Sequence, residues 1–116
     1  MEMDSRLFRG IMGRFATGVT VVTGLDEDRR PFGFTANSLS SVSLDPPLIS
    51  VCVGRDAESH DPLVRAGIFA VNVLSESQEE IARRFASAAH RESRWEGLDW
   101  EVIPPGAPVL AGAHAW

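Results

Sequence analysis

The stretch from Pro31 to Gly54 reads PFGFTANSLSSVSLDPPLISVCVG, and Asp45 is its only charged residue. Because 23% of the residues in the whole chain are charged, this depletion of charge is local. We expect residues 32–44 to be extended and Asp45-Pro46-Pro47 to break the strand, since proline cannot donate to a sheet ladder. Residues 48–53 are nearly all apolar, which predicts a short strand covered on both faces.

Small uncharged polar side chains stand where charges are missing in this stretch. They are Thr35, Asn37, Ser38, Ser40, Ser41, Ser43 and Ser50. Strand alternation divides them between two faces, with Thr35, Asn37, Ser41 and Ser43 on one and Ser38 and Ser40 on the other. A solvated strand face normally carries charges, so we expect a partly buried polar surface whose groups need partners. Those partners are either a ligand with many acceptors, such as a nucleotide, or the neighbouring backbone and water.

Two elements precede this stretch in the sequence. Asp4 or Ser5 can cap a helix whose apolar residues recur at i and i+4 as far as Phe15, and Gly18 can end it. Residues 19–23, VTVVT, are β-branched throughout, which favours a strand. Residues 26–30 then form a charged turn that leads into Pro31.

Signals for two helices and two strands follow the stretch. Asp61-Pro62 marks the start of a short helix that Gly67 ends, and residues 68–74 predict another apolar strand. Residues 75–78 match a capping box, with a second register at residues 77–80, and the helix that follows pairs Ile81 with Phe85 on one face. A short strand at residues 101–103 and a turn at residues 104–106 complete the pattern.

Strands that follow one another through mostly short links, with three helices among them, predict an α+β arrangement. The expected architecture is a mainly antiparallel sheet or small barrel that carries helices. A doubly wound parallel fold is less favoured, because the chain lacks both a regular βαβ alternation and a GxGxxG loop. The length of 116 residues predicts a single domain over residues 1–116.

Composition excludes several classes of function. Sixteen acidic residues against 11 basic ones give a formal charge of -5, which argues against bulk nucleic-acid binding. All the basic residues are arginine, so a Schiff-base lysine is excluded, and a single cysteine excludes an internal disulfide. No apolar run approaches the ~20 residues of a membrane helix, and the start of the chain lacks a signal-peptide layout. We therefore expect a cytoplasmic protein with no membrane partner.

A few residues outside the polar stretch are chemical candidates. Ser59-His60 precedes a helix start, where it either holds an anion or caps the helix. The pair Arg83-Arg84 either reaches a phosphate or is solvated at the surface. Three histidines without metal-ligand spacing, and the lack of a nucleophile–base motif, predict no metal and no catalytic side chain. Cys52 is expected to be an inert core thiol, and Trp95 and Trp100 to be packing or interface residues.

Three segments, taken in order, resemble the flavin reductase-like family. They are residues 15–23 (FATGVTVVT), 33–48 (GFTANSLSSVSLDPPL) and 69–74 (FAVNVL), and Gln78 and Phe85-Ala86 follow them. The resemblance covers most of the chain, and the SVSLDPPL run is its most specific part. Members of this family are FMN-binding split-barrel proteins, often the reductase component of two-component flavin-dependent monooxygenases.

The resemblance implies a split β-barrel with flanking helices, assembled as a homodimer with the flavin near the subunit interface. It implies reduction of FMN or FAD by NADH or NADPH, with the reduced flavin passed to an oxygenase component. Carried over by motif, the residues that line the flavin are Thr35, Ala36, Asn37, Ser38 and Leu39, with Ser41 and Val42 close behind. Those expected at its ring or phosphate side are Cys52, Val53, Gly54, Ser59 and His60. Arg84 and Phe85 are expected to contribute from the helix.

Hydride chemistry belongs to the nicotinamide and the flavin, so the resemblance calls for no catalytic acid or base. Members of the family continue beyond the point where this sequence ends, through more strands and a Gly-Asp-His-type stretch linked to nicotinamide binding. The surroundings of His114 do not match that stretch. We therefore expect an incomplete barrel with an unpaired edge. The alternatives are a flavin-binding or interaction module without reductase turnover, and a split-barrel oxidoreductase for another phosphate-bearing cofactor.

Overall fold

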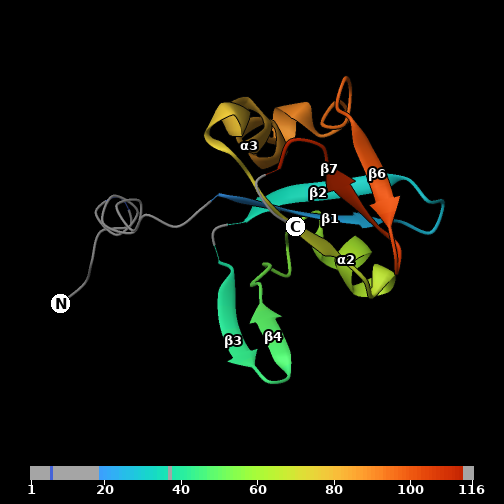
Figure 1. Cartoon of the computed structure of the whole chain (residues 1–116). Helices are drawn as coiled ribbons and strands as arrows, with labels where there is room; N and C mark the ends of the chain where they lie inside the picture. Colours follow the sequence, from blue (N-terminus) through green and yellow to red (C-terminus); the bar gives the residue numbers. More distant parts are fainter. Residues whose placement is uncertain (1–5, 7–18, 37, 114–116) are drawn as a thin grey trace.

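The structure is a computed structural model that describes residue 6 and residues 19–36 and 38–113 (Figure 1). The expected helix before Gly18 lies outside the described residues, as do Asn37 and His114. The described part is mainly β, with three antiparallel sheets and two α-helices. Every strand pair in it is antiparallel, which confirms the predicted arrangement and leaves no room there for a doubly wound parallel sheet.

The largest sheet has the strand order β2-β1-β5. Its strands are β1 (Thr20–Leu25), β2 (Pro31–Ala36) and β5 (Ala70–Val73). In the register, Thr20 pairs with Ala36 on one side and with Val73 on the other. β1 is buried along nearly its whole length, as expected for a β-branched central strand. Asp26 accepts hydrogen bonds from the backbone of Asp28 and Arg30, which closes the predicted charged turn between β1 and β2.

Two hairpins with opposite surroundings complete the β structure. They are β3 (Ser40–Leu44) with β4 (Pro47–Ser50), and β6 (Trp100–Ile103) with β7 (Ala107–Leu110). β7 is buried against the three-stranded sheet, whereas the β3–β4 hairpin projects from the body of the molecule (Figure 1). Residues 48–53 were expected to form a strand that is covered on both faces. This is wrong, because β4 ends at Ser50 and all four of its residues are exposed.

The helices begin and end close to the predicted signals. They are α2 (His60–Ala66) and α3 (Glu79–Ala86), with the 3-10 turns η1 (Glu76–Gln78) and η2 (Ala88–His90). Gly67 ends α2 in the left-handed conformation at φ 68°, a backbone shape that glycine adopts without a steric cost. Ser75 and Gln78 form the predicted capping box, which opens η1 and leads directly into α3.

The core forms where α3 and β7 meet the central sheet. Val21, Phe85 and Leu110 are its buried centre. The ring of Trp95 packs edge-on between Phe85, at 5.2 Å, and Trp100, at 5.3 Å, so of the two expected roles both tryptophans have the packing one in this chain. α3 approaches β2 so closely that a Cβ built at Gly33 would lie 2.8 Å from the Phe85 ring. Only glycine therefore fits at this point of the strand.

A polar network joins the strands beneath this apolar layer. Asn72 is fully buried, and its side-chain amide donates to the carbonyl of Val21 at 3.0 Å and to the hydroxyl of Thr23 at 3.0 Å. Its side-chain oxygen accepts from the backbone of Leu110 at 2.8 Å. The hydroxyl of Thr23 donates in turn to the carbonyl of Pro108 at 2.6 Å. These bonds fasten β7 across the central sheet.

Two sequence-based expectations about strands are corrected by the structure. Residues 32–44 are not one extended strand, because β2 ends at Ala36 and β3 starts at Ser40, with a register shift between Ser41 and Ser43. The predicted division of the polar residues between two faces fails for the same reason, since alternation does not carry across a break. The strand at β7 was not predicted, because a proline inside an apolar run is atypical of a strand.

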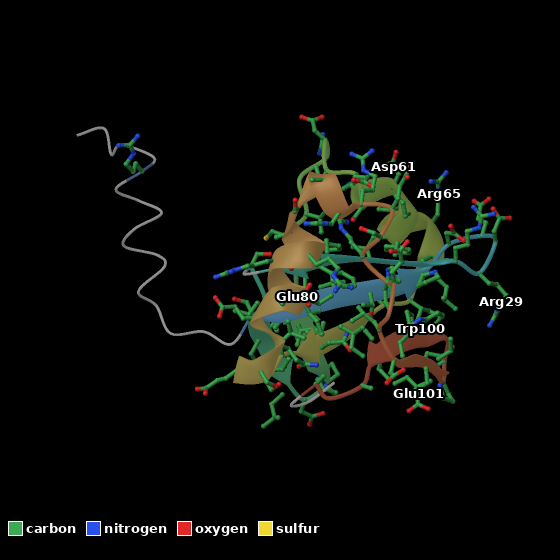
Figure 2. The ribbon with its side chains drawn as sticks, turned by 90° about the horizontal axis from the view of Figure 1, so that it is seen from above. Arg29, Asp61, Arg65, Glu80, Trp100 and Glu101 are labelled. Carbon is green, nitrogen blue, oxygen red and sulfur yellow. The ribbon has the colours of Figure 1, made fainter. Side chains whose placement is uncertain are left out.

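We expect Asn72→Ala to lower the free energy of unfolding by about 3 kcal/mol, because it leaves the buried amide of Leu110 without an acceptor. Urea unfolding followed by tryptophan fluorescence measures this loss. The control is Glu101→Ala, because Glu101 is exposed on β6 and points away from the body of the molecule (Figure 2). Equal stability of the Asn72 variant and the wild type would contradict a structural role for the network.

Candidate functional site

The sequence-predicted site residues lie on four segments of the fold. These are the end of β2, the β3–β4 hairpin with residues 38 and 39 before it, the loop of residues 51–59 with the start of α2, and the last turn of α3. In Figure 1 the chain runs from β2 into the projecting hairpin and then returns through the loop to α2. The structure therefore places most of the predicted residues along one continuous path at the border of the core.

The end of β2 is held on both of its sides. The Thr35 hydroxyl donates to the carbonyl of Ala82 on α3 at 2.6 Å. The carbonyl of Ala36, a buried residue, accepts from the Thr20 hydroxyl on β1 at 2.6 Å. Thr35 and Ala36 therefore have fixed positions relative to both β1 and α3. Asn37, the next predicted residue, lies outside the described residues.

Ser38 and Cys52 are brought together by two hydrogen bonds. The Ser38 hydroxyl donates to the Cys52 carbonyl and accepts from the Cys52 amide, each at 3.0 Å. This pair closes the base of the β3–β4 hairpin, where the chain leaves the core and where it returns. Two predicted site segments that are fourteen residues apart in sequence thus meet here. The alternative that the hydroxyls serve the neighbouring backbone holds for Ser38, as it does for Thr35.

The hydroxyls on the hairpin itself behave differently. Among the described residues none offers a hydrogen bond to the side chains of Ser40, Ser41, Ser43 or Ser50. Ser41 and Val42 are exposed, whereas Leu39 is half-buried. The expected partial burial of this polar surface is therefore wrong for most of β3, because the hairpin stands clear of the core in a single chain. Its hydroxyls are available to a ligand or to a second protein surface.

The loop after β4 carries the next group of predicted residues. Cys52 is exposed, which corrects the expectation of a core thiol, because the apolar run that contains it leaves the sheet at Ser50. Val53 is half-buried and Gly54 is exposed. A Cβ built at Gly54 meets no atom within 4 Å, so the space beside this backbone is open.

Ser59 and His60 stand at the start of α2. Ser59 occupies the N-cap position and is buried, yet its side chain makes no capping hydrogen bond, so the ordinary-cap alternative is not what the structure shows. Nδ1 of His60 lies 2.9 Å from a carboxylate oxygen of Asp61. The residue before them, Glu58, forms a salt bridge of 2.6 Å with Arg91, which ties this loop to the chain after η2.

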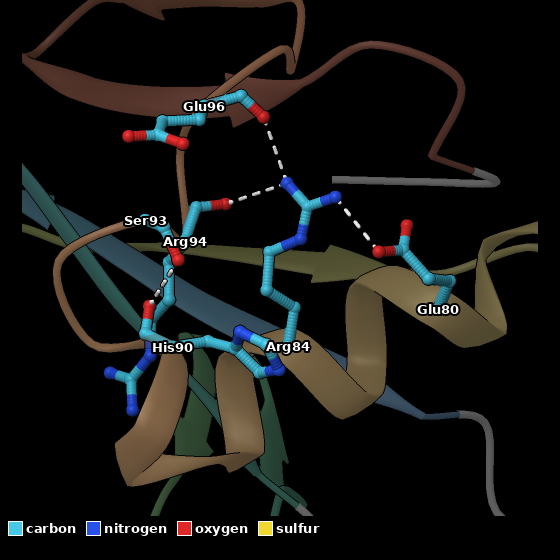
Figure 3. A network of polar contacts seen from close by, with 6 residues as sticks. All are labelled: Glu80, Arg84, His90, Ser93, Arg94 and Glu96. Carbon is cyan, nitrogen blue, oxygen red and sulfur yellow. Dashed lines mark hydrogen bonds and ion pairs between the residues drawn. The ribbon is translucent and has the colours of Figure 1, made fainter.

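The side chains of Arg84 and Phe85 make their contacts within the chain itself. Arg84 donates through Nη1 to the carbonyls of Arg94 and Glu96, at 3.3 and 2.8 Å, and through Nη2 to Glu80 at 2.8 Å (Figure 3). Phe85 is 1% exposed in the core. Arg84 was expected either to reach a phosphate or to be solvated at the surface, but it binds the backbone carbonyls of Arg94 and Glu96 instead. Arg83 is solvated at the surface, where it forms an ion pair with Glu79.

Arg94 is a residue that the sequence reasoning passed over. Its side chain is buried, and it donates to the carbonyl of Gly33 on β2 at 3.0 Å and to that of Ser87 at 3.1 Å. The signal in the sequence is weak, since Arg94 stands in a polar stretch with four other charged residues between His90 and Asp99. Only its neighbour Trp95, an aromatic residue in that polar stretch, indicates that this part of the chain is buried.

The chemistry of the donors fits an uncharged or weakly polar ligand surface. Hydroxyls and backbone amides line the path from Thr35 to Gly54, and its only ionisable groups are the Asp45 carboxylate at the hairpin tip and the Cys52 thiol. Such groups suit the carbonyls, ring nitrogens and hydroxyls of a flavin nucleotide. Within the described ranges no three histidine, cysteine or acidic residues lie together as metal ligands do. No helix of the described residues is both long and apolar enough to span a membrane.

Several flavin reductases are similar to this chain in sequence. The chain is 47% identical over 116 residues to the NADH-dependent FAD reductase of Streptomyces globisporus, covering 97% of this chain and 62% of that protein. It is 41% identical over 113 residues to HsaB, the reductase subunit of a flavin-dependent monooxygenase of Rhodococcus jostii (strain RHA1), covering 97% of this chain and 56% of the subunit. In both comparisons the chain spans less than two thirds of the relative.

A solved structure of a flavin reductase is similar to this chain in its fold. The Streptomyces globisporus C-1027 NADH:FAD oxidoreductase SgcE6, in complex with NAD and FAD fragments, superposes with a TM-score of 0.80 at 43% identity, covering 97% of this chain and 68% of that one. The flavin reductase like domain matches residues 12–116. The chain therefore belongs to the flavin reductase-like domain family, and its fold is that of the flavin reductases, although its three described sheets do not close into a barrel.

We expect Ser38→Ala to raise the hydrogen-exchange rate of the Cys52 amide about fivefold, because it removes a bond worth about 1 kcal/mol at the base of the hairpin. Amide exchange followed by NMR measures this rate. Ser41→Ala is the matched control, since it makes the same chemical change at a hydroxyl without a partner in the described structure. Equal exchange of Cys52 in both variants would show that the Ser38 bonds do not hold the loop.

Proposed function

We propose that this chain binds FMN or FAD along the path from Thr35 to Gly54, with Ser59 and His60 beside it, and reduces it with NADH or NADPH. The proposal treats residues 1–116 as a single domain and assigns the reduced flavin to a partner oxygenase component. The observation that carries it is the nearly charge-free path of hydroxyls and amides, in a chain of the flavin reductase-like domain family. The two named relatives support the reaction and the partner, because one is an NADH-dependent FAD reductase and the other is a monooxygenase reductase subunit.

The residues of this chain would act by binding and orienting. A bound flavin supplies the redox chemistry itself, since its ring accepts the electrons that a reduced nicotinamide nucleotide donates. The amides near Ala36 and Ser38 and the free hydroxyl of Ser41 would hold the flavin, together with the loop from Cys52 to Gly54. Neutral donors of this kind hold the flavin without setting a fixed negative charge against its reduced, anionic form. No side chain of the path is required to carry a proton.

Homodimer formation belongs to the same proposal. The β3–β4 hairpin exposes several large apolar side chains, among them Leu44 at 91%, Leu48 at 50% and Ile49 at 51%. A two-stranded hairpin standing alone is marginally stable in water, and exposed apolar surface of this kind marks a contact with another protein. A second copy of this chain would cover the hairpin and enclose the flavin beside it. We place the protein in the cytoplasm, where reduced nicotinamide nucleotides are available.

The test of the function is a titration of the purified chain with FMN and FAD, followed by flavin fluorescence. NADH or NADPH is then added and the decay of its absorbance is recorded. We expect Ser41→Asp to weaken flavin binding about tenfold, because it places a carboxylate beside an anionic nucleotide. Ser77→Asp is the matched control, since it makes the same change in charge at an exposed position on η1 and is expected to bind flavin like the wild type.

Each outcome of this titration decides something. Flavin binding followed by nucleotide oxidation supports the reductase. Flavin binding without oxidation of the nucleotide supports the alternative of a flavin-binding or interaction module. If the wild type binds no flavin, both the reductase and the flavin-binding module are overturned. If the two aspartate variants bind flavin equally well, Ser41 is not part of the binding site.

We expect Leu48→Glu to raise the concentration at which half of the dimer dissociates at least about tenfold, because it buries a charge against the partner hairpin. Sedimentation velocity across a dilution series measures this concentration. Val64→Glu is the matched control, because Val64 is exposed, at 68%, on α2, and this helix packs on β1. A monomeric wild type, or equal dissociation of both variants, would remove the hairpin from the proposed interface.

A further inference from the structure

Arg94 stands out because it is buried without an acidic partner. It is 9% exposed, and within the described ranges no carboxylate forms a salt bridge with it. Arg83, Arg84 and Arg91 each have such a carboxylate. The Nε atom of Arg94 is buried, and no described residue accepts a hydrogen bond from it. Burying a charge in this way is expensive, and an apolar side chain of similar volume commonly serves stability better.

The contacts of Arg94 indicate what the arginine supplies. One nitrogen of its guanidinium donates to the carbonyl of Gly33 on β2, and the other donates to the carbonyl of Ser87, directly after α3. Its own carbonyl accepts a hydrogen bond from Arg84 on α3 (Figure 3). Arg94 therefore bridges β2 and the end of α3 through backbone groups alone. A planar guanidinium can reach two separate carbonyls at once, which a lysine ammonium does less well.

The position of this bridge matters because β2 is an edge strand of its sheet. Among the described strands none pairs with the outer edge of β2, and Arg94 donates a hydrogen bond to the carbonyl of Gly33 on this strand. Two residues further along the strand lies Thr35, where the proposed flavin path begins. Arg84 and Phe85, the other two predicted site residues on this side, belong to the last turn of α3. Arg94 thus joins two of the segments that carry the predicted site.

We propose that Arg94 is a positioning residue for flavin. It fixes β2 at Gly33 against the end of α3, so that the binding groups from Thr35 onward are positioned before the ligand arrives. This inference rests on the function proposed above. A binding surface that is already in position loses less conformational entropy when the ligand binds. We therefore expect the loss of Arg94 to weaken the affinity for flavin. We expect turnover at saturating flavin to be unaffected, because Arg94 acts through its bonds to Gly33 and Ser87.

The test uses Arg94→Lys and Arg94→Gln, with Arg83→Lys as the matched control on exposed surface. We expect both Arg94 variants to raise the KM for flavin about tenfold while kcat changes less than about twofold. In the flavin-free protein we expect faster amide exchange at residues 34–36 and unchanged exchange at residues 70–73. Arg83→Lys is expected to match the wild type in every measurement.

The outcomes separate this inference from the function on which it depends. If the wild type binds no flavin, the proposed function fails and the role of Arg94 fails with it. If the wild type binds flavin and the Arg94 variants bind it equally well, only the role of Arg94 is overturned. A fall in kcat with unchanged KM overturns it too, as does exchange that rises uniformly over the sheet. If neither variant folds, Arg94 supports the fold at large and the inference is also overturned.

Discussion

The amide of Asn72 is the constraint on which the arrangement of the β structure depends. A fully buried amide must find partners for both its donor and its acceptor, and here they come from β1 and from Leu110 on β7. With Thr23 bonded to Pro108, one polar cluster determines how the β6–β7 hairpin lies on the central sheet. The apolar centre of Val21, Phe85 and Leu110 packs against the strands in the positions that these bonds allow.

The proposed site lies at the margin of this rigid centre. β2 is anchored to β1 by the sheet and to α3 by Thr35 and Arg94, so the first residues of the path are held firmly. Beyond Ser38 the chain leaves the core and forms a hairpin whose hydroxyls and apolar side chains are exposed. The path therefore combines a fixed strand end with a surface that a ligand and a second chain can cover. This division suits a protein that binds a nucleotide between its own core and a neighbour.

The sequence predicted the local elements well, because their signals are local. The β-branched run at residues 19–23, the capping box at Ser75 and the glycine stop at Gly67 all produce the elements that they indicate. The burial of the hairpin was predicted wrongly, because apolar content does not reveal whether the covering surface comes from the same chain. The roles of Arg84 and Arg94 could not be predicted, since their acceptors are backbone carbonyls that only the folded arrangement brings near. β7 was missed because Pro108 masks its strand signal.

The same polar cluster has a consequence for the order in which the chain can assemble during its synthesis. Thr23 and Pro108 are 85 residues apart, and Asn72 bonds both to Val21, 51 residues before it, and to Leu110, 38 residues after it. Contacts of such high sequence separation form late and slow the folding of a small domain. The buried polar groups of the central strands are therefore satisfied only after residues 108–110 have left the ribosome.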